Sequence, residues 1–155
     1  MLGRFTAALL AVLAMTLLSV KKLGVNEAER CENEINYALE EFVCVAERKG
    51  SIGSADIERL YERISLSGAL CYVGVEIGTV LYGLGEKRID VIYYDEVQEL
   101  ILAAERDGEE LDIKGCLITV YAIPLKDGLG ITLANMFWES YIPCSRMVMG
   151  GYIHG

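Results

Sequence analysis

Histidine is almost missing from this sequence, and its scarcity limits the chemistry that the chain can perform. The 155 residues contain one histidine, His154, at the second-last position. Histidine is the usual general base near neutral pH, and residues at chain ends are often poorly ordered. We therefore expect no catalytic role for His154, no Ser-His-Asp or Cys-His catalytic group, and no histidine-rich metal site.

Clusters of basic residues are also missing. The chain has 14 Lys and Arg residues against 23 Asp and Glu residues, for a net charge of −9. A nucleic-acid-binding surface needs clustered Lys and Arg, and an anionic lipid surface attracts basic segments. The composition therefore predicts that the chain does not bind nucleic acid and does not lie flat on an anionic membrane surface.

The sequence contains no C-x-x-C pair. Its five cysteines are Cys31, Cys44, Cys71, Cys116 and Cys144. Their separation removes the spacing signals of zinc, iron–sulfur and thioredoxin-type redox sites. An odd number permits at most two internal disulfides. Cys71 and Cys116 lie within apolar, strand-like runs, which predicts small buried side chains, while Cys44 and Cys144 stay unassigned.

A phosphate-binding loop is suggested only loosely by GTVLYGLGEK, which contains Gly78, Gly83, Gly85 and Lys87. The lysine is misplaced relative to G-x-x-x-x-G-K-[ST], and the hydroxyl residue for magnesium is absent. The segment also lies between two expected strands, without leading into a helix. It therefore predicts a hairpin turn.

Carboxylates gather in two places, Asp95, Glu96 and Glu99, and then Glu109, Glu110 and Asp112. Paired acids can bind calcium or serve as acid and base. Glu96 and Glu99, however, lie on the side of a predicted helix that faces solvent, and Glu109 and Glu110 fall in a loop. The prediction is a solvated surface, and for the chain as a whole no catalytic, cofactor-binding or metal-ligating residue, no cofactor and no enzymatic activity.

A long uncharged run is present at the N-terminal end. Phe5–Val20 carries no charge, with Arg4 before it and Lys21–Lys22 after it. Sixteen residues fall slightly short of the ~20 that span a bilayer core, but Leu2 and Leu23 extend the apolar reach and the basic side chains can snorkel. A cleaved signal peptide needs small residues at alternate positions after the run, and none stand there.

These features predict a retained membrane anchor over residues 1–24; a cleaved signal peptide and a buried helix of a soluble protein remain the alternatives. Positive charge at both ends leaves the orientation undetermined. Ala7, Ala11 and Ala14 form a stripe of small residues, which either permits close helix packing in the bilayer or reflects only the frequency of alanine in apolar helices.

The apolar helix is expected to continue past Gly24 as an amphipathic one. Apolar residues recur at alternating spacings of three and four from residue 25 to residue 48. They are Ala28, Cys31, Ile35, Ala38, Phe42 and Val45, widened by Leu39, Val43 and Ala46. Gly50 is suited to end the element. The pattern therefore predicts one helix of about 45 residues.

The remainder of the chain predicts an α+β head, residues 25–155, in which this helix packs on a small, mainly antiparallel sheet with one or two short helices. A first short helix is expected to be capped by Ser54 and ended by Gly68, with Ile57, Leu60, Tyr61 and Ile64 inward, and to be followed by strands 71–82 and 88–94 joined by turn 83–87. A second helix, 96–107, is expected to be capped by Asp95 and ended by Gly108, with Val97, Leu100, Ile101 and Ala104 inward. The remaining expected elements are a strand 116–123 ended by Pro124, a turn at 126–128, a helix or strand at 131–141, and a strand 146–153 broken at Gly150–Gly151. Tyr93–Tyr94 and Phe137–Trp138 are expected to be half core and half surface.

This plan resembles type IV pilins, and more specifically the small single-pass, pilin-like proteins of the tight-adherence pilus clusters of Gram-positive anaerobes. The most similar segment is FVCVAERKGSIGSADIERLYERISLSGALCYVGVEI, residues 42–77, and Gly150–Gly151 near the end is similar too. Gly3 matches the glycine before the processing site of pilin precursors. The glutamate expected five residues later is replaced by Ala8.

The resemblance implies a pilin-like fold and a structural or assembly subunit of a secretion or adhesion pilus apparatus. It implies a single-pass protein of the cell membrane with an extracytoplasmic head. Its partners would be membrane lipid and, through the N-terminal helix, other pilin-like subunits or an assembly platform. The alternative is a membrane-tethered extracytoplasmic binding module without catalytic activity.

Overall fold

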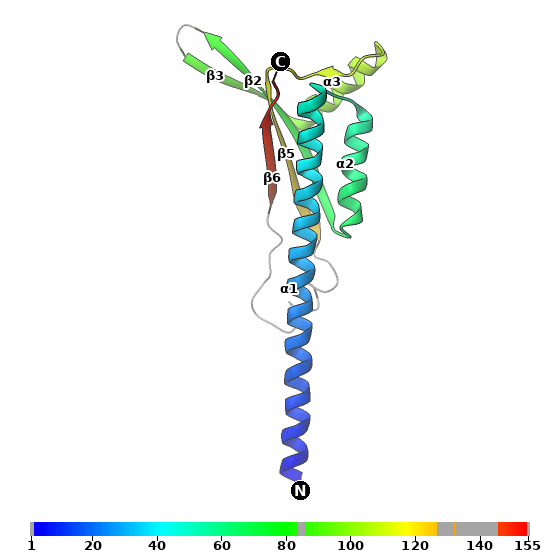
Figure 1. Cartoon of the computed structure of the whole chain (residues 1–155), viewed down its shortest axis with the longest axis vertical. Helices are drawn as coiled ribbons and strands as arrows, with labels where there is room; N and C mark the ends of the chain where they lie inside the picture. Colours follow the sequence, from blue (N-terminus) through cyan, green and yellow to red (C-terminus); the bar gives the residue numbers. More distant parts are fainter. Residues whose placement is uncertain (1, 84–85, 127–131, 133–145, 155) are drawn as a thin grey trace.

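The computed structural model describes residues 2–83, 86–126, 132 and 146–154. In chain order the elements are α1 (Leu2–Lys49), β1 (Ser51–Ile52), α2 (Ser54–Leu66), β2 (Leu70–Gly83), β3 (Glu86–Ile92), α3 (Tyr94–Arg106), β4 (Leu111–Asp112), β5 (Cys116–Lys126) and β6 (Met147–Tyr152). Figure 1 shows α1 as a rod along the long axis, with the head gathered around its C-terminal half. The predicted α+β class is confirmed.

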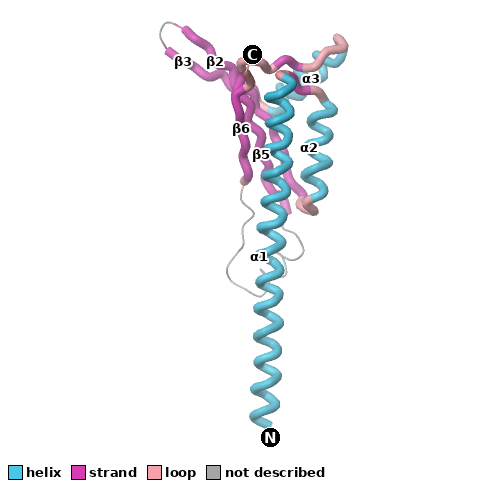
Figure 2. The backbone as a smooth tube through the Cα atoms, in the orientation of Figure 1, coloured by secondary structure: helices cyan, strands magenta, loops and turns pink. Residues whose placement is uncertain are grey.

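The main sheet has four strands in the order β3-β2-β5-β6, and every neighbouring pair is antiparallel. Val75 pairs with Val120, which pairs in turn with Met149. Because side chains alternate along a strand, Val73, Val75 and Ile77 share one face, and all three are buried in the core. Figure 2 shows α1 and α2 beside this sheet. The hairpin of β2 and β3 is confirmed.

Helix α1 runs unbroken for 48 residues and passes through Gly24. The predicted inward face is confirmed in its C-terminal half, because Cys31, Ile35, Ala38, Leu39, Phe42, Val43 and Ala46 are buried, while Ala28 and Val45 are partly covered. Gly50 ends the helix with a φ of +68°, in the left-handed region that glycine adopts at low cost.

Strand β6 continues through Gly150–Gly151, so the predicted break is wrong. Gly151 pairs with Ile118 in the ladder and faces α1. A Cβ atom at Gly151 would collide with Oε1 of Glu47 and lie 2.9 Å from Cγ1 of Val43. Glycine therefore permits α1 to approach the sheet closely at this strand.

Both short helices begin at residues other than those expected. Gly53, and not Ser54, occupies the cap position of α2, and its amide donates to the Asp56 carboxylate at 3.1 Å. Helix α3 begins at Tyr94 with Tyr93 as cap, so Asp95 is not the cap and β3 ends at Ile92. The Val97 amide donates to the Tyr93 carbonyl at 2.9 Å, which places the first helical hydrogen bond there.

The predicted inward faces of α2 and α3 are confirmed in part. Ile57, Leu60 and Ile64 of α2 and Val97 and Ile101 of α3 are buried, whereas Tyr61 and Leu100 are exposed and Ala104 is half-buried. Gly68 and Gly108 have positive φ values just after these helices, as expected of the residues that end them. Tyr93 is exposed and Tyr94 half-buried, which confirms that pair as half surface and half core.

Strand β5 extends past Pro124 to Lys126, so proline does not end it. Pairing with β6 stops at Ala122, and the ladder with β2 shifts register next to Pro124. Proline is tolerated at such edge and bulge positions. Cys71 and Cys116 are half-buried and not fully buried, because each lies near the end of its strand.

Several predictions from the sequence lie outside the described residues. They are Gly85 of the first turn, Asp127 and Gly128 of the second turn, the segment 131–141 apart from Thr132, the Phe137–Trp138 pair, and Cys144.

Truncating Phe42 should destabilise the head strongly. Phe42 is 6% exposed in the core, and removing a buried aromatic ring costs about 3–5 kcal/mol. Tyr37 lies on the same helix and is 64% exposed, so Tyr37→Ala is the matched control, with an expected change below about 0.5 kcal/mol. Urea unfolding of both variants measures the difference, and equal losses would contradict the assigned core face.

The amphipathic half of α1 should be necessary for the head to fold. A fragment of residues 25–155 keeps Ile35, Leu39 and Phe42, which cover the sheet, whereas residues 51–155 lack them. We expect a cooperative thermal transition for the longer fragment and none for the shorter. Equal unfolding curves for the two fragments would show that α1 does not support the head.

Candidate membrane-anchoring helix

Within the described part of the chain, one helix, Gly3–Lys49, is long and apolar enough to cross a membrane. Only 6% of its most apolar 18-residue window is buried. The exposed apolar side chains of this half are Phe5, Leu9, Leu10, Val12, Leu13, Met15, Leu18 and Leu23. The core helix of a soluble protein would bury such residues. The exposure therefore suits a helix surrounded by lipid.

The three hydroxyl side chains of the apolar half are satisfied by the helix itself. Thr6 donates to the Gly3 carbonyl, Thr16 to the Val12 carbonyl and Ser19 to the Met15 carbonyl. Lipid offers no hydrogen-bonding partner, so a polar group in the hydrocarbon core must be paired within the protein. These three residues therefore add little cost to burial of the segment in a bilayer.

The length of the segment also fits a bilayer once its basic flank is included. The uncharged run of 16 residues, Phe5–Val20, rises about 24 Å as an α-helix. Lys21 and Lys22 can direct their ammonium groups toward the interface, which lets the apolar length extend to Leu23. The span then rises to about 28 Å, close to the ~30 Å of a hydrocarbon core.

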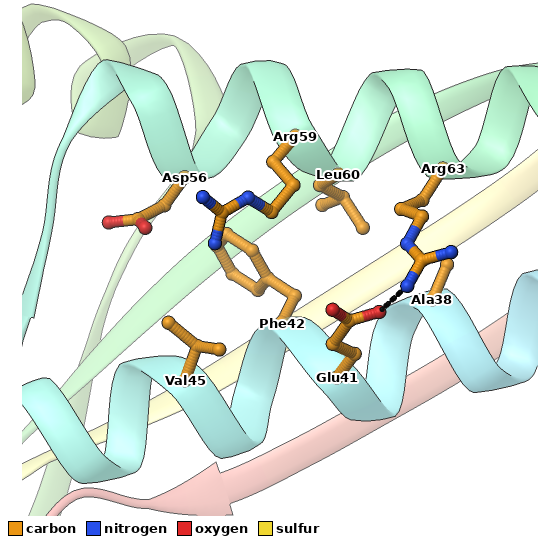
Figure 3. A pocket seen from close by; sticks show the side chains of 8 residues that line it. All are labelled: Ala38, Glu41, Phe42, Val45, Asp56, Arg59, Leu60 and Arg63. Atoms are coloured by element: carbon orange, nitrogen blue, oxygen red, sulfur yellow. Dashed lines mark ion pairs between the residues drawn. The ribbon is translucent and has the colours of Figure 1, made fainter.

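The C-terminal half of α1 is joined to α2 by an apolar contact with charged groups around it (Figure 3). Phe42 and Leu60 lie between the helices, and Nη2 of Arg63 lies 3.0 Å from Oε2 of Glu41. That oxygen is shielded from solvent but has no partner with hydrogen-bond geometry. The cavity between the helices holds about 20 Å³, which is room for one water molecule.

A charged network holds the C-terminal end of α1. Nζ of Lys49 lies 2.8 Å from Oδ2 of Asp56 and 2.9 Å from Oε1 of Glu110, and Ser51 donates to the Glu110 carboxylate. The hydrogen bond from Ser51 and the ammonium of Lys49 lower the pKa of Glu110, whereas its carboxylate partners, Asp56 first, raise the pKa of Lys49. The network joins α1 and α2 to Glu110, the residue directly before β4, which pairs with β1.

A chain of hydroxyl groups joins α3 to α2 and to the edge of β2. Gln98 donates to the Tyr94 hydroxyl at 2.7 Å, and Tyr61 donates to the Val73 carbonyl at 3.3 Å. The two tyrosine hydroxyls are 2.7 Å apart. Because the Tyr61 hydroxyl has a single proton, which it donates to the Val73 carbonyl, Tyr94 is the donor between the two hydroxyls. Burial, and then the bond with Tyr61, raises the pKa of Tyr94, which keeps the donor protonated.

The residues considered from the sequence as catalytic candidates do not converge. His154 is exposed, with its ring 5.2 Å from that of Tyr152 in an edge-on arrangement. Asp95, Glu96 and Glu99 are exposed on α3. Gly78 and Lys87 are paired in the β2–β3 hairpin, with Val91 and Tyr82 respectively. Among the described residues, no group of three His, Cys, Asp or Glu side chains could hold a metal ion.

The second acidic group is exposed, which confirms the predicted solvated surface: Glu109 and Glu110 lie in a loop and Asp112 lies in β4. Glu110 and Asp112 are exposed but engaged, because Glu110 bonds to Lys49 and Ser51 while Asp112 accepts from the Lys114 amide at 3.1 Å. Glu110 and Lys49 are 61 positions apart. No sequence pattern signals such a pair, since it depends on the path of the chain around α2 and α3.

Larger hollows in the described part of the head are open grooves along the helices. One of about 420 Å³ lies between α1 and α2, with Tyr37, Arg63 and Leu66 among its lining residues. Another, of about 270 Å³, lies between α2 and α3, beside Tyr61 and Leu102. Glu34 and Arg63 are the charged residues that line the first groove, and Ser54, Glu58 and Gln98 are among the polar residues that line the second. Both grooves follow from the way in which neighbouring helices pack, and their open shape does not resemble that of an enclosed active site.

Comparisons with protein-family models, with curated proteins and with solved structures found no match to this chain.

Glu110→Gln should weaken the head, and the loss should disappear in acid. The lowered pKa of Glu110 means that its contribution is present above the unfolded-state value and is lost as the pH falls through the folded-state value. An exposed pair contributes about 0.2–1 kcal/mol. The urea midpoint of Glu110→Gln should be lower than that of the unmodified protein at pH 7 and equal to it below pH 4. Glu109→Gln is the control and should match the unmodified protein at both pH values. A loss of the same size in acid would exclude this charge pairing.

Proposed function

We propose that the chain is a pilin-like structural or assembly subunit of a secretion or adhesion pilus apparatus. In this proposal α1 holds the subunit in the cell membrane, with the head on the extracytoplasmic side. The partners are membrane lipid and, through the N-terminal half of α1, other pilin-like subunits or an assembly platform. The protein is not an enzyme.

One observation carries the proposal: a single unbroken helix, Leu2–Lys49, is an exposed apolar rod in one half and the support of the core in the other. An exposed rod can be buried by lipid, or by the rods of neighbouring subunits, without any change in the head. A subunit that passes from a membrane into an assembly needs this property, because its apolar helix must remain covered in both settings.

The head supplies the second line of support. Its core contacts are made against the C-terminal half of α1, from Cys31 onward. The contacts of Glu41 with α2, of Lys49 with Glu110 just before β4, and of Val43 with β6 likewise involve residues beyond Gly24. Force or movement applied to the N-terminal half would therefore pass to the head through the backbone of one helix.

A membrane-tethered binding module stays the alternative, and a deep polar pocket in the head would favour it. The cavity of Figure 3 has room for only about one water molecule, and the larger hollows described above are open grooves. These features lend more support to an assembly subunit.

The proposal is tested in membranes from cells that make the full chain. Carbonate and high salt should leave the protein in the membrane pellet, and cross-linking in intact cells should yield a ladder in steps of about 17 kDa or products with other single-pass subunits. Shearing should release the head in filaments. Release of intact protein by carbonate would exclude the anchor, and membrane-bound protein that yields only monomer would exclude assembly.

Enlarging Ala11 should separate assembly from folding. Ala11 lies on the stripe of small residues in the exposed half of α1, where close helix contact would form. Ala11→Phe should reduce the cross-linked ladder while leaving the thermal unfolding of the head unchanged. Leu10→Phe, on the neighbouring face, is the matched control. Equal effects of the two substitutions would exclude this stripe as the contact.

Substitution of exposed acidic residues and of the histidine should change neither the folding of the head nor the formation of filaments. His154→Ala and the double substitution Glu96→Gln and Glu99→Gln alter exposed side chains, which usually shifts stability by less than about 0.5 kcal/mol. Thermal unfolding and the filament assay report both properties. Loss of biological activity in cells, with normal unfolding and normal filament assembly, would instead indicate a functional site on α3.

A further inference from the structure

Three exposed leucines mark the end of the head that lies toward the N-terminal half of α1. Leu66 is the last residue of α2, Leu70 the first of β2, and Leu125 the second-last of β5. They are 73%, 59% and 59% exposed. Leu66 and Leu70 flank one tight turn, and Leu70 pairs with Lys126 beside Leu125. We call these three residues the basal leucines.

The position of α1 gives the height of the basal leucines above a membrane. Sγ of Cys31 lies 3.8 Å from Oγ of Ser67, so the turn between Leu66 and Leu70 is level with Cys31. Cys31 lies eight positions after Leu23, which is about 12 Å of helix. If Leu23 lies at the edge of the hydrocarbon core, the headgroup layer occupies about 5–7 Å of that height.

The remaining gap of about 5 Å is comparable to the reach of a leucine side chain, and the usual tilt of about 20° lowers one side of the head further. Figure 1 shows the lower ends of α2, β2 and β5 at this level of α1, facing the N-terminal half. The basal leucines therefore lie beyond the apolar surface that α1 presents to lipid, along the same axis and about 12 Å further on.

We propose that the basal leucines form a second membrane contact, in which they rest against the lipid surface of the bilayer that α1 enters. This inference rests on the anchoring role of α1 in the proposed function. Large apolar side chains gain free energy when they leave water, and tilt of the head brings the basal leucines into the interfacial layer of the bilayer that α1 enters, where part of their surface is withdrawn from water. The contact limits the tilt and rotation of the head relative to the membrane.

The charge of the intervening helix selects the kind of lipid. Glu27 and Glu29 lie on α1 between Leu23 and Cys31, and Glu32 and Glu34 follow beside the lower end of the head, where Arg30 pairs with Glu34 at 2.9 Å. Lys21 and Lys22 lie on the membrane side of Leu23. Because the acidic residues, and not the two lysines, are near the level of the basal leucines, anionic headgroups repel this end of the head. The assigned partner is therefore a zwitterionic lipid surface.

Photo-cross-linking tests this contact on the full chain in nanodiscs of phosphatidylcholine. A benzoylphenylalanine replaces Leu66 or Leu125 in turn, and Leu102 is the matched control, because it is 54% exposed on α3 near the other end of the head. We expect lipid adducts, identified by mass, several-fold more abundant at positions 66 and 125 than at 102. Replacing part of the lipid with phosphatidylglycerol at low salt should reduce the adducts, and added salt should restore them.

The possible outcomes are distinct. Equal or absent lipid adducts at the three positions overturn the inference, as do products that join position 66 or 125 to residues 127–145 of the same chain or to a second copy. More adducts with phosphatidylglycerol overturn the assigned lipid class. A chain that does not stay in the nanodisc refutes the anchor of the proposed function, whereas a retained chain without basal adducts refutes only this contact.

Discussion

Backbone hydrogen bonding within α1 is the interaction on which the rest of the structure depends. A helix satisfies its own amide and carbonyl groups, so the same backbone is stable in lipid, where no other partner exists, and against a protein core. Side chains alone distinguish the two halves of Leu2–Lys49. Through this continuity, a segment suited to a membrane and a segment that covers a sheet become one rigid element.

The head depends on this helix because α1 contributes seven of the buried core residues in the described part of the chain, from Cys31 to Ala46. The inner face of the sheet presents Val73, Val75, Ile118 and Val120, and the residues facing them include Ile35, Leu39 and Phe42 of α1. Three joints then determine the angle of the helix: glycine at position 151 on β6, the Glu41–Arg63 pair on α2, and Lys49 at the β1–β4 corner. Contacts with the sheet, with α2 and at the C-terminal end of α1 thus determine the orientation of the helix.

The proposed role and the proposed lipid contact follow from this division. The N-terminal half is free of the core and can exchange lipid for protein neighbours, whereas the head keeps its fold in either setting. The basal leucines lie at the junction of the two halves, and in the proposed contact the acidic residues from Glu27 to Glu34 disfavour anionic lipid there. Under the proposed function, such a contact orients the subunit at the membrane before it associates with others.

Element boundaries show where reasoning from the sequence stops. Ser54 and Asp95 are good capping residues by type, yet Gly53 and Tyr93 occupy the cap positions. Asp56 accepts from the Gly53 amide within the same turn, and Glu105 accepts from the Ser54 amide across 51 positions, so one local and one distant partner stabilise the start of α2. Pro124 fails to end β5 because pairing with β6 already stops at Ala122.

The sequence by itself determined the length of α1, its two faces, the hairpin of β2 and β3 and the α+β class, because hydrophobic periodicity is local and differs between helix and strand. Only the tertiary structure decided that Gly150–Gly151 continues a strand, that Lys49 bonds to Glu110, and that Leu66, Leu70 and Leu125 gather at one end. Each depends on segments that meet in space, and a pattern within one segment carries no information about what it will meet.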